Sequence, residues 1–138
     1  MGTRVKMTNP KTMPKPSGAY SHVARVAAGE LLFIAGQVAL DQSGKMVGDG
    51  DFDAQALQVF ENLRAALQSE GAEFGDVVQF TTYLVDSRDI PKLRKFRERT
   101  YPSFFPDGKY PPNTLLVVNR LASEEMRLEI AAIAAAPG

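Results

Sequence analysis

The pattern of apolar and polar side chains predicts two strands in the first part of the chain. Residues 20–27 and the apolar run 31–35, Leu-Leu-Phe-Ile-Ala, both have the composition of strands. The segment between them, Ala-Gly-Glu at 28–30, suits a tight reversal, so the pattern predicts a β-hairpin. Gly36 then interrupts the second strand, which is typical of a β-bulge or of a close approach between backbone and another group.

A helical period follows over residues 53–70. Asp53 can cap the start of this helix, and Gly71 can end it in the left-handed conformation. β-Branched and aromatic residues over 77–85 then predict a strand. The inner face of the helix follows the spacing i, i+4, i+7, i+11 and consists of Ala56, Phe60, Leu63 and Leu67.

A second helix is predicted to begin near Asp89, because the nearby Pro91 suits a first helical turn. Pro102 and Pro106 are expected to end it. The basic run over residues 92–99 has the composition of a solvated helix face. The inner face is expected to consist of Ile90, Leu93, Tyr101 and either Phe96 or Arg97.

Two closing strands are predicted over residues 114–120 and 126–135. The resulting order, β-β-α-β-α-β-β, predicts an α+β fold with one mixed sheet and both helices on one face. The closing strands are apolar on both sides, and such strands need cover on both. No sequence remains to cover the second face, so we expect another subunit to cover it, in an oligomer whose size the pattern leaves open.

Composition narrows the classes of function. The chain has 138 residues, the size of one domain, with sixteen basic and sixteen acidic side chains. This balance argues against nucleic acid as a partner, because phosphate binding needs a basic face. The chain has no cysteine and one histidine, which excludes thiolate and multi-histidine metal sites. No metal and no cofactor is therefore expected.

The N-terminal residues 1–16 are expected to form a tail that frays or lies along the surface, followed by a single domain over 17–138. The tail lacks the apolar core of a secretory signal, and no apolar run is long enough to span a bilayer. The cytoplasm is the expected compartment, with no membrane partner.

Four segments in the same order resemble the Rid family (reactive-intermediate deaminases, also called the YjgF family). Gly-Ala-Tyr-Ser at 18–21 is similar to the Gly-Pro-Tyr-Ser of that family, and residues 32–37 are similar to its strand ending in Ser-Gly-Gln. Residues 55–78 resemble its first helix and next strand, and residues 111–114 and 128–134 resemble its closing strands. The resemblance implies a chorismate-mutase-like subunit and a homotrimer with a central barrel. It also implies three small-molecule sites in clefts between subunits.

Asn113 is the main departure from the family pattern. Active members carry a Pro-Ala-Arg-Ser/Thr motif here, and its arginine clamps the carboxylate of an imino acid. Asparagine lacks the fixed charge and planar fork of arginine, a loss of about 1.5–3 kcal/mol in binding. Glu98 stands where the family usually has asparagine, so it either adds a negative charge to the cleft or lies on a solvated helix face. One of Arg94, Arg97 and Arg99 could alternatively replace the missing clamp.

Five further residues match site positions of the family. Glu129 matches the glutamate that positions the attacking water, although it could also be an outward carboxylate paired with a nearby arginine. Tyr20 matches a tyrosine of the cleft wall, or else packs in the core. Gly36 would let ligand lie against the backbone, and Ala35 replaces a serine. Leu115 would contribute backbone groups beside Asn113, while its side chain is expected to pack.

The residues and the resemblance leave three functions to compare. The first is a deaminase-type hydrolase acting on an imine, an enamine or a related reactive compound, with standard 2-imino-acid activity in doubt because of Asn113. The second is a protein that binds or senses a small metabolite, which could be neutral or cationic, in the same clefts without catalysis. The third, RNA cleavage or translational inhibition, is disfavoured by the zero net charge.

Overall fold

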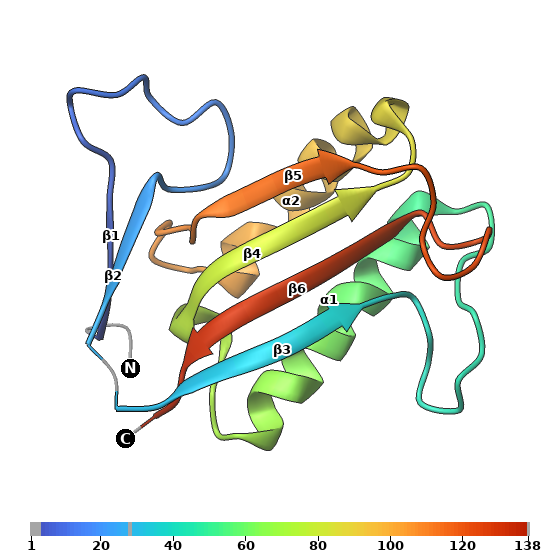
Figure 1. Cartoon of the computed structure of the whole chain (residues 1–138), viewed down its shortest axis with the longest axis horizontal. Coiled ribbons are helices and arrows are strands. Elements are labelled where there is room, and N and C mark those ends of the chain that lie inside the picture. Colours follow the sequence, from blue (N-terminus) through green and yellow to red (C-terminus); the bar gives the residue numbers. More distant parts are fainter. Residues whose placement is uncertain (1–3, 28, 138) are drawn as a thin grey trace.

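The computed structural model describes residues 4–27 and 29–137. Figure 1 shows an α+β fold in which four strands form one mixed sheet and both helices cover the same face of it. The strand order is β3-β6-β4-β5, and a separate ribbon pairs β1 with β2. The strands are β1 Val5–Thr8, β2 Val23–Val26, β3 Leu31–Gln37, β4 Val77–Leu84, β5 Asn113–Val117 and β6 Leu128–Ala135.

Helix α1 (Phe52–Ser69) buries the predicted stripe of apolar residues against the sheet. The cap is Asp51, whose side chain accepts a hydrogen bond from the Ala54 amide, so the prediction of Asp53 was wrong by two residues. Gly71 follows the helix at φ 75°, as its position predicted, because glycine has no Cβ to clash there.

Helix α2 (Ile90–Phe104) follows a short 3-10 turn, η3 (Ser87–Asp89), and a second such turn, η2 (Phe74–Asp76), precedes β4. The prediction that Pro102 ends α2 was wrong, because Pro102 lies inside the last turn. The helix continues so that aromatic rings pack around Phe60. Its neighbours, at centroid distances of 5.4–6.2 Å, are Phe74, Phe80, Phe96, Tyr101 and Phe104.

The predicted hairpin does not form. Strand β2 pairs antiparallel with β1 instead, and β3 pairs with β6. The proposed reversal includes Ala28, which lies outside the described residues. Strand β1 belongs to the segment expected to be a tail, yet Val5 is buried there and the Arg4 guanidinium donates to Asp76 and to the Ala136 carbonyl. Pairing with β1 therefore gives β2 a partner outside the main sheet.

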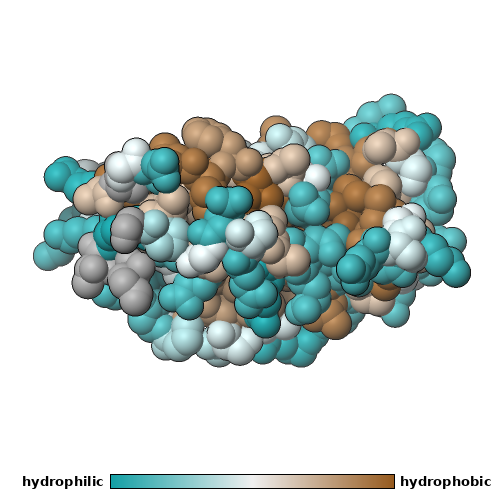
Figure 2. Space-filling view, turned by 90° about the horizontal axis from the view of Figure 1, so that it is seen from below, coloured by the Kyte–Doolittle hydropathy of each residue, from teal (hydrophilic) through white to brown (hydrophobic). Residues whose placement is uncertain are grey.

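No described element covers the sheet face opposite the helices (Figure 1). Alternation along β6 places Leu128 and Ile130 on the buried helix side and leaves Glu129 half-buried on the open side. Phe33 is 73% exposed and Leu116 is 41% exposed, and both pair with residues of this open face. Figure 2 shows hydrophobic surface gathered mainly along the upper margin of the molecule. Cover by another subunit stays a prediction.

Across the described part of the chain, neither helix has the length and apolar character that crossing a bilayer requires.

Candidate functional site

A cavity of about 590 Å³ opens between α2, the start of β5 and the segment 17–20. We call it the β5–α2 cleft. Four residues singled out from the sequence line it together: Tyr20, Glu98, Asn113 and Leu115. These positions are far apart in the chain, so the fold is what brings them into one site.

The strand register explains why Asn113 and Leu115 face the cleft. Strand β5 runs parallel to β4, with Asn113 opposite Phe80 and Leu115 opposite Thr82. Phe80 and Thr82 are both buried on the helix side of the sheet. Asn113 and Leu115 share that side, and they lie on the outer strand of the sheet, where α2 leaves room beside them.

The segment that carries Tyr20 is fixed to the approach of β5. The buried Ser21 hydroxyl donates to the Tyr110 carbonyl at 2.5 Å, and the Ser21 amide donates to the Pro111 carbonyl at 3.5 Å. Tyr110 also lines the cleft. Tyr20 is only partly buried, so its ring forms part of the cleft wall rather than part of the core.

Asn113 is engaged by its neighbours. Its Oδ1 accepts a hydrogen bond of 2.7 Å from the Thr82 hydroxyl and one of 3.3 Å from Arg97 Nη2. The same Nη2 donates to Thr82 Oγ1 at 3.2 Å. The three side chains therefore form a closed triangle at the base of the cleft, in which Asn113 acts as an acceptor for a guanidinium.

Arg97 is the residue that sequence reasoning placed least well. The sequence placed it in a solvated basic run, gave a buried position only as an alternative to Phe96, and named it with Arg94 and Arg99 as one possible replacement for the missing clamp. In the structure both residues are buried, and Arg97 is only 8% exposed. The signal was present in the spacing, because Arg97 lies four residues from both Leu93 and Tyr101 on the inner face.

The surroundings of Arg97 satisfy its charge only in part. The guanidinium lies 5.4 Å from the centre of the Tyr101 ring, within the range of a cation–π contact. Its Nε is buried and has no hydrogen-bond partner within the described chain. Burial raises the pKa of the Tyr101 phenol above its ordinary value of 10.0, while Arg97 acts in the opposite direction. Tyr101 thus stays neutral beneath the cation.

The charge of the cleft differs from the sequence expectation. Glu98 does line the cleft and is exposed, but Arg94 and Arg97 line it as well. These two guanidinium groups and one carboxylate are the charged groups among the lining residues, which leaves an excess of one positive charge. The cleft that lost an arginine at position 113 is therefore not acidic.

Glu129, Gly36 and Ala35 lie elsewhere in the single chain. A Cβ built on Gly36 would stand 1.9 Å from Glu129 Oε2, so the carboxylate lies directly over the glycine backbone. The register of β3 against β6 shifts between Ile34 and Gln37, which confirms both the bulge and the close approach indicated by Gly36. Ala35 lines a shallow groove of the open face beside Phe33.

The ion pairs considered for Glu129 do not involve it. Arg120 pairs with Glu124 at 3.0 Å, and Arg127 pairs with Asp89 at 2.8 Å. Glu129 faces the open side of the sheet, whereas the β5–α2 cleft lies on the helix side. The structure thus divides the predicted site residues into two groups, one around Asn113 and one around Glu129.

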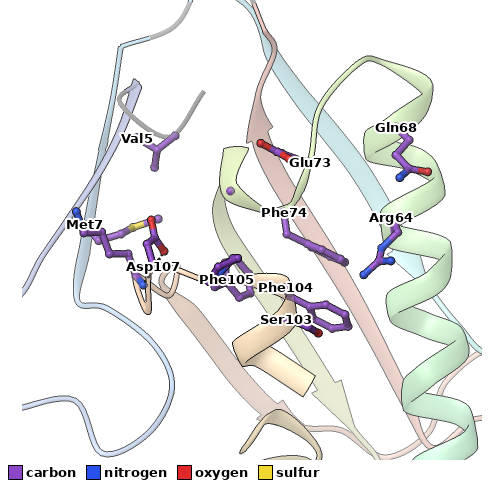
Figure 3. Close-up of a pocket in the computed structure, with 13 residues that line it drawn as sticks. Val5, Met7, Arg64, Gln68, Glu73, Phe74, Ser103, Phe104, Phe105 and Asp107 are labelled. Atoms are coloured by element: carbon purple, nitrogen blue, oxygen red, sulfur yellow. Dashed lines mark hydrogen bonds between the residues drawn. The ribbon is translucent and has the colours of Figure 1, made fainter. Parts of the chain in front are cut away.

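A second cavity, of about 530 Å³, lies between β1, α1 and the end of α2 (Figure 3). Arg64 from α1 extends toward Phe74 and Phe104, with its guanidinium carbon 5.3 and 5.2 Å from the two ring centres. None of the site residues indicated by the sequence lines this cavity. Its basic groups, Arg64 and Lys109, are balanced by Glu73 and Asp107.

No cluster of three or more histidine, cysteine, aspartate or glutamate side chains suited to a metal ion occurs within residues 4–27 and 29–137.

Comparison with known proteins identifies relatives along nearly the whole chain. The family model described as endoribonuclease L-PSP matches residues 10–136. A RutC family protein of Pyrococcus horikoshii is 37% identical over 88% of this chain and 90% of its own. The 2-iminobutanoate/2-iminopropanoate deaminase of Salmonella typhimurium is 30% identical over 86% of this chain and 90% of its own.

The fold also matches a solved structure. The crystal structure of a Rid family protein of unknown function from Yersinia pestis, YyfB, has a TM-score of 0.85 and 34% identity, covering 96% of this chain and 98% of that one.

Proposed function

The chain belongs to the Rid family, matched under the description endoribonuclease L-PSP, and from this premise we propose that it hydrolyses a small imine or enamine in clefts between the subunits of a homotrimer. Water adds to the carbon of the C=N bond, the nitrogen takes up the proton, and ammonia leaves as the carbonyl forms. Glu129 holds the attacking water, and the residues of the β5–α2 cleft hold the substrate.

The observation that carries the proposal is the placement of Glu129. Its carboxylate lies over Gly36 on a sheet face that no described element covers. A carboxylate kept half-buried without an arginine partner is available to a water molecule and a substrate. The cleft around Asn113 faces the other side of the sheet, so Glu129 and the cleft of the same chain cannot hold one ligand together. A neighbouring copy packed on the open face would bring its own cleft to this Glu129.

The test is the rate of imine hydrolysis by the purified protein. We expect acceleration with 2-iminopropanoate or with a neutral imine, and a loss of about 10²-fold or more in Glu129→Gln, since this change removes the base but keeps the shape. Turnover of neither imine would contradict catalysis, and a monomer in sedimentation equilibrium would contradict the shared cleft.

Gly36→Ala gives an independent test of the Glu129 position. The new Cβ would force the carboxylate to move, so activity should fall about tenfold or more, whereas Gly75→Ala should leave it unchanged because a Cβ there meets nothing within 4 Å. Equal activity of the two variants would argue that the position of Glu129 does not matter to turnover.

A binding protein without catalysis is the second candidate. It is favoured by Asn113, whose amide oxygen is already engaged by Thr82 and Arg97. A metabolite at one hundred times its dissociation constant would stabilise the fold by about 2.7 kcal/mol. Thermal shifts with metabolites, together with absent imine turnover, would support this candidate over the hydrolase.

A further inference from the structure

Arg97 is a nearly buried cation without an anionic partner in the described chain. Among the described residues it donates hydrogen bonds to neutral groups, including Thr82 Oγ1 at 3.2 Å and Asn113 Oδ1 at 3.3 Å, and it also interacts with the neutral Tyr101 phenol. Its Nε has no partner, and no carboxylate of the described residues lies within salt-bridge distance of it. Arg127, by contrast, is paired with the buried carboxylate of Asp89 at 2.8 Å.

A buried charge without a counter-charge is unfavourable, and proteins normally pair it. The face of Tyr101 and the two neutral oxygens stabilise the guanidinium only partly. Arg97 also lines the β5–α2 cleft, so a group that enters the cleft can reach it. An unpaired cation held at the wall of a small-molecule cavity is the arrangement expected of an anion site.

We propose that Arg97 is the anion-binding group of the β5–α2 cleft and that the ligand carries a carboxylate, held from α2 rather than from position 113. This deepens the proposed function and rests on it for the reaction, although binding of the anion does not depend on turnover. The substrate class is then a 2-imino acid or a related small carboxylate.

The geometry around Asn113 supports an anion-binding arginine at position 97 in place of one at position 113. Asn113 Oδ1 accepts a hydrogen bond from Arg97, and through Thr82 it fixes the orientation of the guanidinium. A second arginine at position 113 would face Arg97 with a like charge at this distance. Asparagine at 113 and arginine at 97 therefore fit together, and Asn113 acts as a positioning residue.

A carboxylate suits the cleft better than a phosphate. The planar guanidinium matches the planar carboxylate with two parallel hydrogen bonds. The lining residues provide only one excess positive charge, and the Glu98 carboxylate would repel a dianion more strongly than a monoanion. The cavity of about 590 Å³ accommodates a small organic acid.

The experiment is isothermal titration of the full chain with pyruvate, a stable 2-oxo carboxylate, and with pyruvamide, its neutral counterpart. The wild type should bind pyruvate at least about tenfold more tightly than pyruvamide. Arg97→Met should lose this preference, while Arg99→Met should keep it. Arg99 is the matched control, because it lies two residues along the same helix but is exposed and paired with Asp53 at 3.0 Å.

A second variant guards against a folding defect. Arg97→Lys keeps the charge but loses the planar fork, so pyruvate should bind at least about threefold more weakly, with the melting temperature recorded for every variant. Pyruvate affinity unchanged in either Arg97 variant, equal binding of pyruvamide by the wild type, or no binding of either compound at millimolar concentration would overturn the proposal.

The outcomes also separate this inference from the proposed function. Hydrolysis of a neutral imine by a wild type that shows no preference for pyruvate would leave the hydrolase standing and overturn the role of Arg97. A pyruvate preference that disappears in Arg97→Met, combined with no imine turnover at all, would establish the anion site and refute the hydrolase.

Discussion

Asp89, the residue just before α2, and Arg97, in the middle of that helix, are both buried charges, and the fold pairs only one of them with an opposite charge. Asp89 is fully buried, and its carboxylate receives two hydrogen bonds from Arg127, at 3.1 and 2.9 Å, with Lys92 at 3.4 Å. Arg97 is almost as deeply buried but contacts only neutral groups.

The difference separates a structural charge from a charge kept for a ligand. Asp89 lies at the start of α2, and its bonds to Arg127 connect that helix to the residue before β6. The charge of Asp89 is compensated by Arg127 of the same chain, so a ligand is not required to neutralise it. Arg97 lies two turns later at a cavity wall, where a partner can still enter. Burial alone therefore does not distinguish the two roles, whereas pairing does.

Breaking the ion pair between Asp89 and Arg127 should have the largest effect on stability. Arg127→Met leaves the Asp89 carboxylate buried with only Lys92 near it, and we expect a loss of about 3 kcal/mol in the free energy of unfolding. Urea denaturation measures this loss. Arg120→Met is the control, because its ion pair with Glu124 is exposed and its removal should change stability by less than about 0.5 kcal/mol.

Removing the unpaired charge of Arg97 should have a smaller effect on stability, and of the opposite sign. Arg97→Met replaces a buried guanidinium without a counter-charge by an apolar side chain, while the hydrogen bond between Thr82 and Asn113 remains. We expect the free energy of unfolding to be unchanged or raised by about 1 kcal/mol. A loss of 2 kcal/mol or more in urea denaturation would make Arg97 a structural residue like Asp89.

The phenol below Arg97 gives a pH test of the same region. Burial raises the pKa of Tyr101 above 10.0, so the folded protein holds this proton more tightly than the unfolded chain does. Its contribution to stability is complete below pH 10 and is lost as the pH rises from there through the folded pKa. Thermal melts of wild type and Tyr101→Phe should diverge in slope above pH 10, and parallel slopes would contradict this.

The smallest expected effect is at the rim of the cleft. Glu98→Gln removes the exposed carboxylate and should strengthen pyruvate binding by about two- to fivefold at low salt. The gain should shrink at 0.5 M salt, because screening weakens interactions between exposed charges. Titrations at two salt concentrations measure it, and a weaker affinity in the variant would instead give Glu98 a direct role in holding the ligand.

Local patterns predicted those elements whose stabilisation is local. The stripe of Ala56, Phe60, Leu63 and Leu67 fixed α1, and Gly71 fixed its end. The pairing of β2 was missed because strand partners depend on contacts far along the chain, here with residues 5–8. Helix α2 was predicted to end at Pro102 but continues to Phe104, because packing around Phe60 outweighed the local preference of proline.

Four of the seven site residues expected from the sequence lie in one cleft, and their arrangement could not be predicted. Tyr20, Glu98, Asn113 and Leu115 were named from the sequence, and the fold brought all four to one cleft. Periodicity admitted Arg97 only as an alternative to Phe96. It could not show that the guanidinium would reach Thr82 and Asn113, because that contact depends on how α2 packs against β4 and β5.

The amino-acid sequence by itself determined the order of helices and strands, the apolar faces that pack together and the absence of an arginine at position 113, because these depend on residue type and spacing. Only the tertiary structure decided which cation stands near that position. A charge on a helix is solvated or buried according to the elements that pack on it, and at Arg97 they exclude water without supplying a carboxylate.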